Sequence, residues 1–434
     1  METAQNTNIR NAGRRLTIRA SRHSLSFSAL DVTQDGNSVT FEPYTVRSGI
    51  SMAANLREAF KTAALPSMDF KRALLMVDSP VLIMPVDLFR EQDTEVLYRH
   101  SFSTLFQEWQ STEEATRVSK SFENVFLVPM PKQTVDVTVT LFDTHRQVRS
   151  SLKHRVNPQD ILIRPVQEGQ KWEYLRRSGD SREKIDVAFV AEGYRQDEMD
   201  VFRRDCEESI GAMLSHEPFR SMADRFNFVA VYSPSTDSGV SIPHQGVWKR
   251  TATDSHFDTF YSQRYLTTLH LKRLHDLLSG IPYEHIVILA NTDNYGGGGI
   301  FNSYLLSAAH HPSCKPVVVH EFGHSFAGLG DEYYYDDQYE STYPADTEPW
   351  EPNLTTLVDF SSKWADMMPA KAKIPTKPSG KNLYTAVGVY EGGGYQSKGV
   401  FRPSQECRMK INEAPEFCPV CQRAIARMIA YQTR

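Results

Sequence analysis

Hydrophobic residues are distributed along the chain in two patterns that predict strands. The segment from Val135 to Leu141 alternates apolar and polar positions with a period of two, which is typical of a strand with one buried face. Other segments are short apolar runs rich in β-branched residues, which indicate buried strands: Ile185 to Tyr194, Phe226 to Tyr232 and His285 to Leu289. We expect the first of these to lead into a helix from Asp197 onward.

A buried helix is predicted around residues 317–326. It begins with three consecutive valines, Val317 to Val319, and Phe322 and Phe326 place further apolar side chains on other faces. Gly328 follows, and glycine readily takes the positive φ that ends a helix. The chain can therefore turn sharply directly after this helix.

Two histidines within this helix have the spacing of metal ligands. His320 and His324 are four residues apart, or about 40° around a helix axis, so both can reach one ion while Glu321 faces the same cavity. A catalytic zinc ion takes three protein ligands and keeps a fourth position for water, whose proton Glu321 could transfer to a leaving amine. A surface helix with solvated histidines is the alternative, but unpaired polar groups in a buried helix would be costly. The pattern therefore predicts a zinc hydrolase.

The run from His320 to Tyr333 supports this interpretation. Read as H-E-F-G-H-S-F-A-G-L-G-D-E-Y, it resembles the signature of the IgA-specific metallopeptidase family in the metzincin clan of zinc peptidases, with the glycine one residue later than in common metzincins. The resemblance implies Asp331 as the third ligand, in agreement with the spacing from Gly328, and Glu332 is the alternative. It also implies that Met409 forms the methionine turn beneath the zinc site.

The resemblance covers about residues 100–434, and the N-terminal part of the chain does not match. It implies an α/β (α+β) fold, in which a metzincin-like zinc peptidase domain has a mixed twisted sheet and an active-site helix. We expect an N-terminal α/β region of unclear role at residues 1–98, a β-rich accessory portion at 99–170 and the catalytic domain at 171–434. Within the first region, the pattern of residues predicts a helix from Met52 to Ala63.

Candidate substrate-binding residues follow from a glycine run and from two tyrosines. Four consecutive glycines precede Ile300, which suits an edge strand to which an extended substrate could pair, so Gly298, Gly299 and Ile300 are candidates. A flexible surface loop is an equally good interpretation. Tyr333 or Tyr395 could stabilise the oxyanion of the reaction, and nothing in the spacing selects between them.

The chain has five cysteines, which are Cys206, Cys314, Cys407, Cys418 and Cys421. Cys418 and Cys421 form a C-x-x-C pair, but the second pair of a zinc ribbon is missing and no thioredoxin-like context is evident. In an oxidising compartment we therefore expect a disulfide between Cys407 and one of these two. Packing as small apolar groups is the alternative.

A long stretch from Asp336 to Gln405 is rich in proline and aromatic residues. Such a stretch near an active site forms either a lid or substrate-binding wall, or a packed structural excursion. The acidic pair Asp336 and Asp337 could bind a second cation such as calcium, although a solvated helix end is more common.

Composition adds few constraints. The 434 residues, 40% of them hydrophobic and 23% charged, suffice for two or three domains. A formal charge of -5 gives no reason to expect nucleic acid or an anionic membrane as a partner. No segment approaches the roughly eighteen apolar residues of a membrane span. Residues Met1 to Arg15 lack the apolar core of a secretory signal, whereas the family resemblance implies a secreted or cell-envelope protein.

These features predict a zinc-dependent endopeptidase with one catalytic zinc ion and protein or peptide substrates. A non-catalytic binding or adhesion protein that retains a metallopeptidase fold is the alternative. Glu321 distinguishes the two, because a scaffold has no need of a base beside its metal ligands. Substrate preference and oligomeric state are left open by the sequence.

Overall fold

The structure is a computed structural model. It describes residues 13–20, 24–32, 38–47, 73–77 and 84–90 as strands, and also residues 96–160, 163, 169–335 and 343–433. The predicted helix from Met52 to Ala63 and the acidic pair Asp336 and Asp337 lie outside the described residues.

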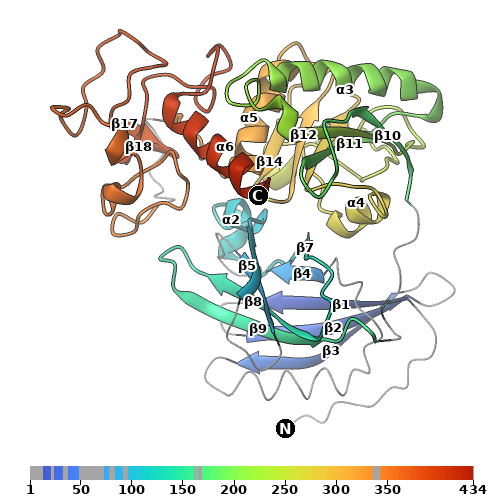
Figure 1. Cartoon of the computed structure of the whole chain (residues 1–434). Coiled ribbons are helices and arrows are strands. Elements are labelled where there is room, and N and C mark those ends of the chain that lie inside the picture. The colour runs from blue at the N-terminus through green and yellow to red at the C-terminus, as the bar shows by residue number, and fades with distance from the viewer. Residues whose placement is uncertain are drawn as a thin grey trace. The chain divides into compact units, whose positions relative to one another are not determined.

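The chain divides into two compact units, which are described separately (Figure 1). The first is formed by Met1–Gln167 with His270–His275, and the second by Glu168–Leu269 with Asp276–Arg434. None of the helices in the described part of the chain combines the length and the apolar character needed to cross a bilayer.

The described residues of the first unit between β1 and β9 form two sheets and a short helix. Its elements are β1 Gly13–Ala20, β2 Ser24–Val32, β3 Ser38–Arg47, β4 Ala73–Val77, β5 Met84–Arg90, β6 Val96–Phe102, α2 Phe106–Trp109, β7 Phe122–Phe126, β8 Val135–Phe142 and β9 Val148–Val156. One sheet has the order β3-β2-β1-β4-β7, with β1 and β4 parallel and the other neighbours antiparallel. The other sheet is antiparallel, with the order β6-β5-β8-β9.

Strand β8 confirms the strand that was predicted from the alternating pattern. Its apolar residues from Val135 to Leu141 are buried. Asp136 is also buried, and it forms ion pairs with Lys153 at 2.7 Å and Arg155 at 3.1 Å on β9. A buried carboxylate is tolerated here because two cations from the neighbouring strand reach it.

The second unit is built around a six-stranded mixed sheet. Its strands are β10 Lys171–Arg176, β11 Ile185–Glu192, β12 Phe226–Tyr232, β13 His285–Ala290, β14 Gly297–Ile300 and β15 Tyr304–Ala308. The order is β10-β12-β11-β13-β15-β14, with parallel central strands and an antiparallel strand at each edge. Every residue of β11 and β13 is buried, which explains their apolar runs. The three strands predicted from such runs are confirmed, as is the mixed sheet of the predicted fold class.

Helix α5 lies in the core of this unit. The other helices of this unit are α3 Met199–Leu214 and α6 Pro419–Gln432, and α5 itself spans Cys314–Ala327. Helix α4, Leu271–Leu277, begins in the residues of the first unit and ends in those of the second. Helix α5 packs against β14 and β15 and also contacts α3 and α6 (Figure 1). Phe322 and Phe326 are fully buried and stack with ring centroids 5.0 Å apart. Burying each such side chain contributes about 1.5–3 kcal/mol, so the predicted buried helix is confirmed and firmly fixed.

Strand β14 passes so close to α5 that Gly297 and Gly299 have little room for side chains. A Cβ on Gly299 would lie 2.4 Å from the carbonyl oxygen of Glu321, and one on Gly297 would lie 3.0 Å from Cγ1 of Val317. The strand pairs with β15 on one side. On its other side, the described residues contribute an isolated bridge between Gly297 and Tyr265. The glycine run is therefore an edge strand in close approach to a helix.

The C-terminal part of the second unit adds a small three-stranded sheet. Its order is β16-β18-β17, with bounds β16 Tyr334–Tyr335, β17 Tyr390–Gly393 and β18 Tyr395–Arg402. The preceding irregular stretch is packed in its described part, since Trp364 and Leu354 are fully buried and Trp364 Nε1 donates to Gly388 O at 2.8 Å. This burial favours the structural excursion over a lid.

We expect Gly323→Ala to lower the free energy of unfolding by about 1–3 kcal/mol. A Cβ there would lie 2.6 Å from Met409 Sδ and 3.1 Å from Phe417 Cε1, so the packing beneath α5 must shift. The matched control is Gly211→Ala in α3, where a Cβ meets nothing within 4 Å. This control should raise stability by about 0.5–1 kcal/mol. Equal stabilisation of both variants in chemical denaturation would contradict the tight packing of Met409 under α5.

Candidate active site

The end of α5 brings the chain back toward its own histidines. Gly328 follows the helix with φ 62° and ψ 31°, in the left-handed region predicted for it. Its N–H donates to the carbonyl of His324 at 3.0 Å, and the N–H of Leu329 donates to the carbonyl of Gly323 at 3.2 Å. These bonds satisfy carbonyls at the end of the helix and reverse the chain direction.

Three donor atoms meet directly after this turn. The Nε2 atoms of His320 and His324 lie 3.0 Å apart. Oδ1 of Asp331 lies 3.0 Å from the first and 3.2 Å from the second. The side chains are 13%, 15% and 6% exposed, so the donor atoms are shielded from bulk water but not sealed off.

The other ring nitrogens determine where the imidazole protons reside. Nδ1 of His320 lies 2.9 Å from Arg408 O, and Nδ1 of His324 lies 2.5 Å from Leu329 O. A carbonyl can only accept, so each Nδ1 carries a hydrogen, and each Nε2 of the neutral ring presents a lone pair. Two lone pairs and a carboxylate oxygen then face one another, which is repulsive unless a cation lies between them. The donor set therefore fits a metal ion.

Burial and mutual charge set the pKa values in this group. Burial disfavours a charged imidazole, but nearby Asp331 outweighs this effect and raises the pKa of His324 to about 9. The pKa of His320 is raised by the same balance. Burial would raise the pKa of Asp331, yet the two histidines hold it well below its ordinary value. Burial raises the pKa of Glu321. The raised pKa values of both histidines and the lowered pKa of Asp331 thus show that these three side chains attract a positive charge, either a proton or a metal ion.

Asp331 is held in place by groups on the small C-terminal sheet. The N–H of Gly394 donates to the carbonyl of Asp331 at 2.8 Å, and the Tyr395 hydroxyl donates to Asp331 Oδ2 at 2.5 Å. The rings of Tyr333 and Tyr395 form an edge contact with centroids 5.3 Å apart. Of the two tyrosines proposed for the oxyanion, Tyr395 therefore contacts the candidate ligand directly.

Met409 lies in the core beneath α5. It is fully buried, and its carbonyl accepts the N–H of Glu332 at 2.8 Å. The preceding residue, Arg408, supplies the carbonyl that orients His320. Met409 therefore packs against the helix that carries the candidate histidine ligands.

Glu321 and strand β14 lie next to each other beside the candidate metal ligands. Glu321 is partly exposed, and its carboxylate forms no hydrogen bond with the described residues. Gly297 to Ile300 form β14, which passes beside Glu321 and His324. The candidate base and the candidate substrate-binding strand are therefore neighbours.

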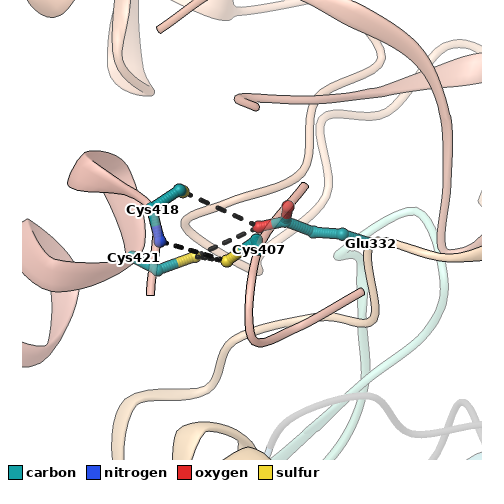
Figure 2. Close-up of side chains that lie close together, drawn as sticks. All are labelled: Glu332, Cys407, Cys418 and Cys421. Carbon is teal, nitrogen blue, oxygen red and sulfur yellow. Dashed lines mark hydrogen bonds between the residues drawn. The ribbon is translucent and has the colours of Figure 1, made fainter. Parts of the chain in front are cut away.

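Glu332 points away from the histidines and into a cluster of cysteines. It is fully buried, and its Oε1 accepts from Asn353 Nδ2 at 3.0 Å and from Cys421 Sγ at 3.1 Å. Figure 2 shows Glu332 reaching toward Cys407, Cys418 and Cys421. The alternative third ligand of the sequence analysis is thus engaged elsewhere.

The predicted disulfide is wrong, because all five cysteines are free thiols. Sγ of Cys407 and Sγ of Cys421 lie 3.8 Å apart, beyond the roughly 2.05 Å of a disulfide. The absence of a second C-x-x-C pair did not indicate that Cys407 and Glu332 complete a group of four with Cys418 and Cys421. In the sequence, this group is marked by a third cysteine, Cys407, shortly before the C-x-x-C pair.

Residues 174–385 and 379–429 match the family described as IgA Peptidase M64, and residues 83–153 match the Peptidase M64 N-terminus. A comparison with curated proteins gave no match. The first match covers α5 and all the candidate ligands, and together the matches span well over half of the sequence. The chain belongs to the IgA peptidase M64 family.

Proposed function

We propose that this protein is a zinc-dependent endopeptidase that hydrolyses peptide bonds of protein substrates, with its catalytic domain at residues 171–434. Family membership supports a peptidase. The observation that carries the zinc assignment is the meeting of two Nε2 atoms and a carboxylate oxygen within 3.2 Å of one another. Two neutral imidazoles and a carboxylate form a donor set that zinc takes in catalytic sites with one open position.

His320, His324 and Asp331 would hold the ion. Bound there, zinc supplies a Lewis acid for the scissile carbonyl and lowers the pKa of a water molecule in the open position. The carbonyls of Arg408 and Leu329 fix the orientation and tautomer of both rings. Tyr395 fixes the carboxylate of Asp331 in the same way.

Glu321 is the proposed general base and acid. It follows the first ligand, is partly exposed and is free of hydrogen bonds to the described residues. A carboxylate in this position can take the proton of the attacking water and return it to the leaving amine. The non-catalytic alternative gives no reason to place, beside the ligands, a half-buried carboxylate that has no hydrogen bond to the described residues, since even partial burial of such a group costs stability.

Substrate is proposed to extend along β14. Edge strands can pair with an extended peptide, and Gly298, Gly299 and Ile300 lie beyond the bridge at Gly297. The scissile bond would then lie beside Glu321, because the strand passes that residue. Tyr333 is proposed to donate a hydrogen bond to the oxyanion, since Tyr395 already contacts Asp331.

We expect Glu321→Gln to lower kcat on a protein substrate by about 10²–10⁴-fold, because the proton transfers lose their carrier. The metal content should stay the same, since Glu321 is not a proposed ligand. Glu183→Gln, an exposed site on the same unit, is the control and should keep full activity. Casein hydrolysis and elemental analysis of each protein measure the two effects. Unchanged turnover of Glu321→Gln would refute its role.

We expect Tyr395→Phe to weaken metal retention by about 10–100-fold, because Asp331 loses the hydroxyl that orients it. Dialysis against buffers of defined free zinc, followed by elemental analysis, measures the change. Tyr261→Phe, whose side chain is exposed, is the control. Identical zinc retention in both variants would mean that the hydroxyl of Tyr395 does not support the ligand.

A further inference from the structure

A second group of potential metal ligands lies in the core of the same unit. Cys407, Cys418, Cys421 and Glu332 are each fully buried, and one donor atom from each lies within 4.8 Å of all the others. The four side chains converge (Figure 2), and they come from three segments of the chain. Glu332 comes from the segment between α5 and β16, Cys407 follows β18, and the other two cysteines begin α6.

The distances in this cluster fit a tetrahedral ion. Two sulfurs that each lie about 2.3 Å from a common zinc ion are about 3.8 Å apart at the tetrahedral angle. Sγ of Cys407 and Sγ of Cys421 are 3.8 Å apart. A sulfur and a carboxylate oxygen on the same ion would be about 3.5 Å apart. Glu332 Oε1 lies 3.1 Å from Cys421 Sγ and 4.0 Å from Cys418 Sγ, on either side of that value.

The buried carboxyl group of Glu332 distinguishes this cluster from cysteines that merely pack as small apolar groups. Three cysteines alone could fill a core as small apolar groups. A fully buried carboxyl group among them is costly unless its oxygens are bonded, and Oε2 of Glu332 has no hydrogen-bond partner among the described residues. Thiols are weak donors, so they satisfy a carboxylate poorly. A cation bound by the same four side chains removes this cost.

Local backbone structure also suits metal binding. Cys418 and Cys421 are separated by two residues, which is the spacing found in many zinc sites. The backbone N–H of Cys418 donates to Cys407 Sγ at 3.2 Å. Such a bond stabilises a thiolate more than a thiol, because the charged sulfur is the stronger acceptor.

We propose that Cys407, Cys418, Cys421 and Glu332 bind a structural zinc ion, separate from the one at the histidines. The three thiols bind as thiolates and release their protons to solvent. Four protein ligands leave no position for water, which is the arrangement of structural rather than catalytic zinc sites.

The position of this ion gives it a defined effect on the active site. Glu332 directly follows Asp331, and Cys407 directly precedes Arg408, whose carbonyl orients His320. The ion would therefore connect Asp331 and the backbone carbonyl that orients His320 to the start of α6. Its loss should loosen Asp331 and His320 together.

The test is metal analysis combined with zinc-edge X-ray absorption on the full-length protein, purified without chelator. We expect about two zinc ions per chain and zinc–sulfur scattering near 2.3 Å. A His320→Ala, His324→Ala double variant should retain about one zinc, now mainly sulfur-bound, because the cluster is intact. This variant tests the cluster without altering it, so a folding defect in cysteine variants cannot obscure the answer.

Cysteine variants complete the design. Cys421→Ser should lose the sulfur-bound zinc, whereas Cys206→Ser, which alters a buried cysteine in α3, should retain both ions. A double histidine variant without zinc would overturn the proposal, as would iron in place of zinc. Mass spectrometry showing a disulfide between Cys407 and Cys421 in the native protein would also overturn it. None of these outcomes depends on whether the histidine site is catalytic.

Discussion

The constraint on which this structure depends is the need to hold two imidazole lone pairs and a carboxylate oxygen face to face inside a core. Without a proton or a metal ion between them these groups repel, so the fold must restrain each of them. Helix α5 is anchored by Phe322 and Phe326, and the histidines it carries are fixed by two backbone carbonyls. Other features of the site, including the glycines of β14 and the turn at Gly328, follow from bringing backbone close to that helix.

Much of this arrangement could be predicted from sequence because it is local. Helical geometry alone places His320 and His324 on one face, and Gly328 marks the end of the helix by its conformational freedom. The buried strands of the mixed sheet were equally readable, because β11 and β13 are covered on both faces and so contain continuous apolar runs. The family signature added Asp331, which no periodicity would have selected.

The remaining features could not be predicted, because they depend on contacts between distant segments. The carbonyl of Arg408 can be supplied by any residue type, so no pattern marks it as the partner of His320. Tyr395 reaches Asp331 across 64 positions, and Cys421 reaches Glu332 across 89. The predicted disulfide failed for the same reason: sequence proximity suggested that the cysteines bond to one another, whereas the fold adds a carboxylate among them.

The two ligand groups are linked through one dipeptide. Asp331 faces the histidines, whereas the next residue, Glu332, faces the cysteines. The carbonyl of Met409 accepts the N–H of Glu332, and the carbonyl next to it orients His320. A displacement of the Asp331–Glu332 backbone would therefore alter both groups at once. The two adjacent acidic residues after the glycine turn are thus not interchangeable candidates for one ligand position, because each contacts a different group of side chains.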